Sequence, residues 1–552
     1  MELNAKTPGR QDARKTWRLG VFLLAALALT AMTAERGVGR EARAPQAGNR
    51  VAEGIAALER GDVAGARELF ESALAVDPKN AVAHTNLGLI ADSAGDPETA
   101  ARHFAEAARH APSAATHNNY GVILLRLGRE REAAAELEAS LRIDPRQPNA
   151  LVNLAQIRFA AGTLADLEAA EGLLARAFAI APDAEIARAM TVIALRRGNT
   201  QSAAAHYAAY TSHLSSATET AIGGAAARGE LGGALLEAGL FREAEVELTA
   251  AVTLDPKNAD AVVSLARVAL AREDLPAAGR TLEGAVARGT ESAPLYALLA
   301  EVYERSGHIE NAIPAMRLAI QRDPESERYR FRYGMLLMDA YAPAAAVIRL
   351  EEAIKVFPSS PRLWFALGLA HFKHERDDDA TRALERALEL DPKFAPAVAY
   401  LGMIRAKVGA YAEAVTHYDR ALQMDPSLVV VHFLIAESLV KLADADTARI
   451  ETHLKRVVAA DPTFVPAHLA LARLLIRSER WTEAVSELEK AVSVDPEVAE
   501  AYYHLGRVYS RLKRADDARA AVATFERLSA SQKEQEHTEL QQVVRRLADV
   551  RF

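Results

Sequence analysis

The chain has 552 residues, half of them apolar and a quarter charged, and its net charge of −8 is small for this length. Ala and Leu dominate over the strand-favouring Val, Ile and Thr, which is typical of an ordered helical protein. The mild acidity gives no electrostatic footprint for nucleic acid, so a nucleic-acid partner is not expected. The absence of cysteine excludes disulfides, thiolate metal sites and a cysteine nucleophile.

The first predicted element is an apolar segment near the N-terminus. Arg10, Arg14, Lys15 and Arg18 precede an uncharged run over residues 19–34, and a basic region followed by an apolar run is typical of an export signal. The run is short for a membrane span of ~20 residues. Two alternatives therefore stay open for residues 1–34, a cleaved signal peptide and an uncleaved signal anchor that meets the membrane through residues 19–34.

Both alternatives place the body of the protein across a membrane, because the basic flank stays on the cytoplasmic side. The sequence thus predicts an extracytoplasmic protein, periplasmic or secreted, which the N-terminal segment would anchor in the inner membrane if it is not cleaved. Residues 35–46 carry Gly, Pro and several charges, and this composition predicts a linker.

The rest of the chain is marked by Asp-Pro pairs at intervals of about 34 residues or close multiples, as between 391 and 425 or between 461 and 495. A period in this range indicates one supersecondary unit stacked many times. Because proline cannot continue a helix and the residue before it leaves the α region, each pair predicts a helix end. The aspartates of these pairs are Asp77, Asp144, Asp255, Asp323, Asp391, Asp425, Asp461 and Asp495.

With each of these prolines at position 32 of a 34-residue frame, the other positions come into line. The clearest repeat starts at Pro361 and carries Trp364, Leu367, Gly368, Ala380, Leu384, Ala387 and Pro392. This pattern resembles the tetratricopeptide repeat. The resemblance implies an all-α solenoid, a right-handed superhelix of helix-turn-helix units. The small residues Gly368 and Ala380 stand where the two helices of a unit should cross closely.

The frame predicts about fourteen units. Units 1–5 occupy residues 47–217, a break falls at 218–224, and units 6–14 occupy 225–528. Two short insertions, near Leu164 and near Asp444, are expected in turns between helices. Residues 529–552 predict a capping helix with Leu540, Val543, Val544 and Leu547 on one face, which would close the last exposed core of the array.

No enzyme motif survives a search of the sequence, and the repeats leave almost no chain for a catalytic domain. The histidines at repeat position 4 should pack inside the units, where the resemblance predicts a bulky residue. We therefore expect a protein that is not an enzyme, with no catalytic residue, no metal site and no cofactor. These histidines are His84, His117, His432 and His468.

A row of asparagines stands at position 6 of units 2 to 4. Its members are Asn86, Asn119 and Asn153. The first helices of tetratricopeptide units line a concave face, and the row resembles the asparagine ladder in the superhelix of O-linked N-acetylglucosamine transferase, where amides grip a peptide backbone. An amide both donates and accepts hydrogen bonds, which suits a backbone of any sequence. The alternative is family background, because Asn is common at this position.

A row of cations stands at position 13 of the last five units. It consists of Lys373, Lys407, Lys441, Arg477 and Arg511, and it is thickened one helical turn back by Arg473 and Arg507. Such a row would favour an acidic peptide or an anionic polymer, with an affinity that falls as salt rises. Here too, family background is the alternative to a dedicated site.

The sequence leaves three functions open. The first is a non-enzymatic scaffold, exported or membrane-anchored, that binds a peptide or partner protein in the concave groove. The second is a binder of an anionic polymer, such as a polysaccharide, during export or assembly. The third is a regulatory subunit of a separate transferase.

Overall fold

The computed structural model describes residues 44–214, 224–442, 446–529 and 546–547, and over these residues the chain is an all-α solenoid without strands. The predicted signal or anchor at 1–34, most of the predicted break at 218–224 and nearly all of the predicted capping helix at 529–552 lie outside the described residues. Within the described part, no helix has the length and apolarity that crossing a membrane requires.

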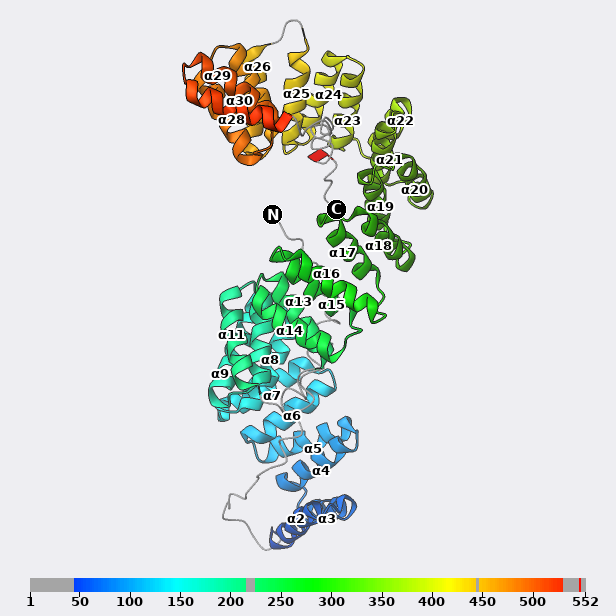
Figure 1. Cartoon of the computed structure of the whole chain (residues 1–552). Helices are drawn as coiled ribbons and strands as arrows, with labels where there is room; N and C mark the ends of the chain where they lie inside the picture. Colours follow the sequence, from blue (N-terminus) through cyan, green and yellow to red (C-terminus); the bar gives the residue numbers. More distant parts are fainter. Residues whose placement is uncertain (1–43, 215–223, 443–445, 530–545, 548–552) are drawn as a thin grey trace. The chain divides into compact units, whose positions relative to one another are not determined.

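The chain divides into two compact units, Met1–Glu291 and Ser292–Phe552. The helices of the first unit form pairs 1 to 7 (Figure 1). In chain order they are α2 (Ala44–Glu59), α3 (Val63–Val76), α4 (Ala81–Ser93), α5 (Pro97–His110), α6 (Ala114–Arg126), α7 (Glu130–Ile143), α8 (Pro148–Ala161), α9 (Leu164–Ile180), α10 (Ala184–Arg196), α11 (Thr200–His213), α13 (Ala225–Glu237), α14 (Phe241–Leu254), α15 (Ala259–Ala271) and α16 (Leu275–Ala287).

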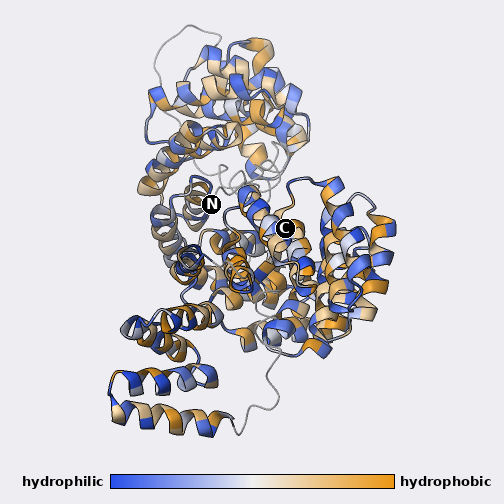
Figure 2. Ribbon diagram, turned by 90° about the horizontal axis from the view of Figure 1, so that it is seen from above, coloured by the Kyte–Doolittle hydropathy of each residue, from blue (hydrophilic) through white to orange (hydrophobic). Residues whose placement is uncertain are grey.

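The second unit contains pairs 8 to 14. In chain order its helices are α17 (Ala293–Arg305), α18 (Ile309–Arg322), α19 (Glu327–Asp339), α20 (Pro343–Val356), α21 (Pro361–Lys373), α22 (Asp377–Leu390), α23 (Ala395–Lys407), α24 (Tyr411–Met424), α25 (Val429–Val440), α26 (Thr447–Ala460), α27 (Val465–Arg477), α28 (Trp481–Val494), α29 (Ala499–Arg511) and α30 (Ala515–Ser529). Figure 2 shows hydrophobic and hydrophilic residues alternating along these ribbons, as amphipathic helices require.

The Asp-Pro pairs end the second helices, as the sequence predicts. Asp77, for example, has an extended backbone (φ −130°, ψ 91°), and its N–H still donates to the carbonyl of Ala73, the last bond of α3. Its carboxylate accepts from the N–H of Lys79 at 3.1 Å and so closes the turn toward the next pair. The aspartate therefore satisfies a backbone donor in the turn that the proline opens.

In eight of the fourteen pairs glycine stands at repeat position 8, where the two helices approach closely, and the other six carry Ala or Thr there. At Gly368 an added Cβ would lie 2.7 Å from the Cγ of Leu384 and 3.3 Å from the carbonyl oxygen of Ala380. The same conflict occurs at Gly402, whose Cβ would meet the Tyr418 ring at 2.5 Å. The close approach predicted at Gly368 is confirmed.

The insertion expected in a turn near Leu164 lies in a helix instead. The second helix of pair 4, α9, spans 17 residues, whereas α7 and α11 span 14. The preceding turn is short, with Gly162 in the left-handed region (φ 75°) and Thr163 as the N-cap. A helix can absorb extra residues at its first turn because the carbonyl of each added residue accepts a hydrogen bond from the N–H four residues later.

Pairs 5 and 6 share a core, although residues 215–223 between them are not described. Tyr207 and Tyr210 of α11 cluster with Leu231 of α13 and with residues of α14 and α15. Three polar groups meet inside this junction. The Tyr207 hydroxyl donates to Glu247 at 2.9 Å, and Arg228 lies 3.4 Å from the second oxygen of the same carboxylate. Burial, followed by the charge of Glu247, raises the pKa of Tyr210 to about 12.

Candidate functional site

The exposed side of the first helices in pairs 2 to 4 carries the asparagine row. We call positions 2, 6, 9 and 13 of a first helix its stripe, because these positions lie one above another at spacings of four and three. In α4 the stripe exposes two apolar residues, Val82 at 50% and Leu89 at 37%. Asn86 lies between them, and its side-chain nitrogen donates to the carbonyl of Val82 at 2.8 Å. Among the described residues, no donor of its own helix bonds its amide oxygen.

The other two asparagines of the row repeat this position on α6 and α8, which contact each other. Asn119 and Asn153 are half-buried. Among the described residues, neither side-chain amide makes a hydrogen bond to protein. The structure therefore keeps the three predicted amides at one register of successive first helices, with polar capacity to spare.

Asn118, next to Asn119 on α6, is a residue that sequence reasoning missed. Its side chain is about nine-tenths buried, and its Oδ1 accepts no hydrogen bond within the described part of the chain. A buried amide oxygen without a donor is costly unless something satisfies it. The adjacent asparagines Asn118 and Asn119 could have pointed to this residue, because position 5 lies next to position 6, where the predicted row stands.

Charged groups near this stripe are already matched. Arg126 of α6 forms an ion pair with Asp92 of α4. Arg196 of α10 lies 4.4 Å from the centroid of the Phe159 ring of α8, and burial lowers its pKa. The N-terminal stripe thus offers amides and apolar side chains more than net charge.

Part of the basic row in the second unit is neutralised by neighbouring carboxylates. Lys407 lies 2.9 Å from Asp377 and 5.3 Å from the centroid of the Phe372 ring. Arg473 lies between two glutamates, 2.9 Å from Glu500 and 3.4 Å from Glu437.

Glu500 keeps its negative charge in this arrangement. A hydrogen bond from His504, followed by the charge of Arg473, lowers the pKa of Glu500 even though burial opposes the shift. Lys407 and Arg473 therefore do not offer free positive charge to a ligand.

The remaining members of the row have no carboxylate partner among the described residues. Arg507 lies 5.6 Å from the centroid of the Tyr503 ring, and the Nε of Arg477 donates weakly to the carbonyl of Arg473 at 3.5 Å. The full set without a carboxylate is Lys373, Lys441, Arg477, Arg507 and Arg511. The structure thus keeps five of the seven predicted cations available.

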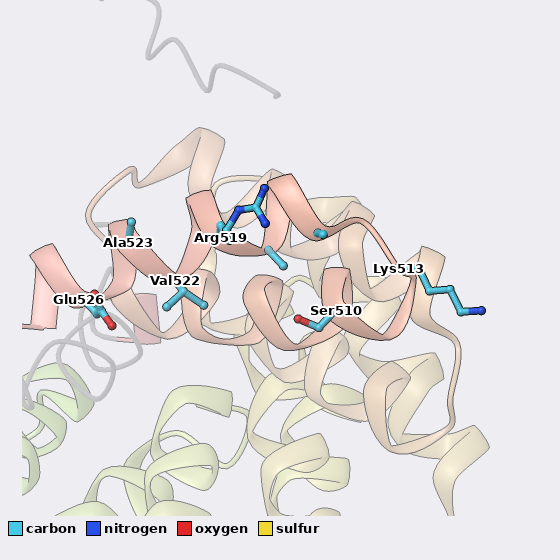
Figure 3. A pocket seen from close by; sticks show the side chains of 8 residues that line it. Ser510, Lys513, Arg519, Val522, Ala523 and Glu526 are labelled. Carbon is cyan, nitrogen blue, oxygen red and sulfur yellow. The ribbon is translucent and has the colours of Figure 1, made fainter.

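Two hollows, each of about 500 Å³, lie at the last pair. One is lined by Trp481, Tyr503, Arg507, Arg511 and Phe525, so two cations of the row stand beside three aromatic rings. The other lies against α29 and α30, with Ser510, Val522 and Glu526 among its walls (Figure 3). The 34-residue frame did not predict the first hollow, because Tyr503 and Phe525 occupy repeat positions whose side chains usually pack inside the units.

The position-4 histidines pack against the second helix of their own pair, which confirms the packing role expected for them. His84 meets His103 with 3.0 Å between their Nδ1 atoms, and His432 meets His453 at 2.8 Å. The other two face a glutamate, His117 with Glu136 and His468 with Glu487, at 2.6 Å each. No group of three or more His, Asp or Glu side chains placed to hold a metal occurs in the described ranges.

Comparison with family models identifies the repeat. Models described as tetratricopeptide repeat match residues 51–115, 91–148, 235–302, 293–326, 361–394, 378–429 and 469–532. Together these ranges cover more than half of the 552 residues. The chain belongs to the tetratricopeptide repeat family. Its members' role in holding proteins and peptides makes a protein-interaction scaffold the coarse function of this chain.

Solved tetratricopeptide structures resemble the chain only distantly. Yeast Tom70 is 16% identical with a TM-score of 0.39, over 85% of this chain and 96% of that one. YrrB, described as a repeat protein with an unusual peptide-binding site, is 20% identical with a TM-score of 0.29, over 32% and 91%. Pseudomonas aeruginosa pilF is 19% identical with a TM-score of 0.33, over 40% and 97%. These values support no conclusion about function, and no curated protein sequence matches the chain.

Proposed function

We propose that this tetratricopeptide protein is a non-enzymatic scaffold that binds an extended segment of a partner protein along the stripe of pairs 2 to 4. The observation that carries the proposal is the register of Asn86, Asn119 and Asn153 on successive first helices, half-exposed beside the open apolar residues Val82 and Leu89.

The chemistry of this stripe fits an extended backbone. Each amide can donate to a carbonyl and accept from an N–H of the ligand, which is the pairing that a strand-like segment needs. The apolar residues between the amides offer contacts to the ligand's side chains, and exposed apolar surface of this kind marks interaction sites.

Binding can be tested with the full-length protein as bait for partners from its own cell envelope. A variant with Asn86, Asn119 and Asn153 all changed to Ala should recover the partner at least about tenfold less well, because hydrogen bonds at the centre of an interface dominate its energy. The control is Asn311→Ala on α18, an exposed asparagine outside the row. Equal recovery by the triple variant and the control would refute the proposed site.

We propose further that the scaffold is exported or anchored through residues 19–34. The support is the basic flank followed by the apolar run. In cells whose outer layers have been opened but whose inner membrane is intact, added protease should digest the repeats. Digestion that begins only after the inner membrane is breached would refute export.

The second candidate function, binding of an anionic polymer such as a polysaccharide, is favoured by the hollow where Arg507 and Arg511 stand beside Trp481 and Tyr503. Aromatic faces and guanidinium groups together suit an anionic sugar chain. Changing Lys441, Arg507 and Arg511 to Glu should abolish binding of a polyuronate in about 50 mM salt, where screening still leaves such charges effective. Unchanged binding would dispose of this candidate.

A further inference from the structure

The stripe of pairs 10 to 12 differs sharply from the open stripe of pair 2. Five of its residues are apolar and buried, with Tyr400 fully inaccessible to solvent, whereas Arg362, Glu437 and the lysines at position 13 are charged. The buried members are Ala366, Leu369, Tyr400, Met403 and Val430, and all belong to one continuous core cluster. In α4 the stripe residues Val82 and Leu89 remain exposed. In pairs 10 and 11, neighbouring first helices bury part of the stripe, because the Phe365 and Phe372 rings of α21 lie edge-on to Tyr400 of α23, with centroids 5.4 and 6.2 Å away.

The C-terminal end of the chain packs into the same apolar cluster. Leu547 is 1% exposed and belongs to the same core cluster as the buried stripe, although it follows the last helix pair in sequence. It is absent from the separate cluster that pairs 13 and 14 share. Leu547 therefore belongs to the apolar cluster that runs from pair 9 to pair 13.

Arg546 fixes the position of this leucine. Its Nε and Nη2 both lie 3.0 Å from one carboxylate oxygen of Asp461, the residue that ends α26. Its guanidinium also lies 4.4 Å from the centroid of the Phe464 ring. A charge-assisted bond and a cation–π contact from one side chain are more than a chance surface encounter provides.

Asp461 responds to this contact. Burial alone would raise its pKa, but hydrogen bonds from Thr463 and from Arg546 outweigh burial and hold the pKa below its usual value. The group is thus ionised near neutral pH, when Arg546 is charged as well.

The same local motif occurs earlier without such a partner. Residues 391–394 read Asp-Pro-Lys-Phe, and residues 461–464 read Asp-Pro-Thr-Phe. In both turns the aspartate accepts from the N–H two residues on, Lys393 at 3.0 Å and Thr463 at 3.1 Å. Among the described residues, Asp391 forms no ion pair, whereas Asp461 binds Arg546. Asp391 is therefore a matched control for substitutions of Asp461.

We propose that the turn between α26 and α27, together with the apolar cluster beside it, is a peptide-binding site which the chain's own C-terminal end fills in cis, through Arg546 and Leu547. The site recognises a basic residue followed by an aliphatic one: Asp461 and Phe464 take the guanidinium, and the apolar cluster takes the leucine. A partner for this site must carry similar chemistry and displace the C-terminal end. The inference does not depend on the proposed role of the asparagine row.

The absence of cysteine allows a direct test by thiol labelling of the full-length chain. In a Leu547→Cys variant the thiol should react with a maleimide at least about tenfold more slowly than in Ser529→Cys, an exposed site at the end of α30. Adding Asp461→Asn to the Leu547→Cys variant should speed its labelling by about tenfold or more, because a charge-assisted hydrogen bond is lost. Adding Asp391→Asn instead should leave the rate unchanged.

Three outcomes of the labelling experiment would overturn the proposal. They are equal reactivity of the Leu547→Cys and Ser529→Cys thiols, an equal effect of the two aspartate substitutions, and a labelling rate that falls as protein concentration rises. The last result would assign the contact to a second copy of the chain.

A second measurement leaves Leu547 intact. A fluorescent peptide with the sequence of residues 540–552 should bind an Arg546→Glu variant of the full chain at least about tenfold more tightly than the unaltered chain, whose site is already filled. Equal binding to both proteins, or binding to neither, would contradict occupation in cis.

Discussion

Adjacent glycines in α13 give a sharp test of how the pairs are packed. An added Cβ at Gly232 would lie 2.5 Å from the Cγ of Leu248 and 3.2 Å from its backbone nitrogen, which cannot move independently of α14. At Gly233 nothing lies within 4 Å. The two positions share a helix and a sequence environment but differ in what faces them.

The expected magnitudes follow from two opposing effects. In a helix, Ala is more favourable than Gly by about 1 kcal/mol, and this gain applies to both positions. Overpacking a close crossing costs about 1–3 kcal/mol, and this cost applies to Gly232 alone. Gly233→Ala should therefore stabilise α13 by up to about 1 kcal/mol. Because the shared gain cancels, Gly232→Ala should be less stable than Gly233→Ala by about 1–3 kcal/mol.

Hydrogen exchange of α13 and α14 peptides in the full-length chain is the suitable assay. A long repeat array does not unfold in one step, whereas exchange reports the free energy of local opening. Combining Gly232→Ala with Leu248→Ala should show a favourable coupling, because the smaller side chain leaves room for the new methyl group. Equal protection of the two single alanine variants would refute the packing described at this crossing.

Three other outcomes are expected. Glu247→Ala should destabilise the junction of pairs 5 and 6 by about 3–5 kcal/mol, measured by the same exchange experiment, because it leaves the nearly inaccessible Arg228 without that carboxylate. Burial first, and then a neighbouring imidazole, lower the pKa of His432 to about 4. Protection of α25 and α26 should thus be full above pH 6.5 and fall between pH 6.5 and about 4, a dependence that His432→Gln should flatten. Asp377→Asn should raise affinity for a polyanion roughly twofold by freeing Lys407, and a lower affinity would contradict the pairing.

The sequence predicts the fold well because the determinants of each unit are local and repeated. Asp391 with its following proline ends α22, as the other pairs of the 34-residue frame end their helices, and Gly368 permits a crossing that a larger residue would block. Each unit packs mainly on its neighbours, so the same few positions decide the structure again and again. The length of α9 could not be predicted from the repeat pattern, because both a helix and a turn can absorb added residues.

The candidate sites are less predictable because the carboxylates that meet the cations come from neighbouring repeats. Asp377 begins the second helix of pair 10 and neutralises Lys407 of pair 11, and Glu437 stands at position 9 of α25, the same position that Arg473 holds on α27. Sequence position shows where Lys407 and Arg473 lie but not which carboxylate reaches them. The contact between Arg546 and Asp461 is harder still, because it joins residues separated by 85 positions.

The two stripes show how residue type decides whether a repeat surface stays open. Asn86 can remain in water at little cost, because solvent satisfies its amide until a ligand replaces the solvent. Tyr400 and Met403 at equivalent positions would expose a contiguous apolar patch if left uncovered, and soluble proteins avoid such patches or fill them. In this chain the Phe365 and Phe372 rings of α21 cover Tyr400, and Leu547 is buried in the same apolar cluster. A partner that displaces the C-terminal end must therefore bury at least the apolar surface that Leu547 already buries, whereas a partner of pairs 2 to 4 displaces water from Asn86 and its neighbours.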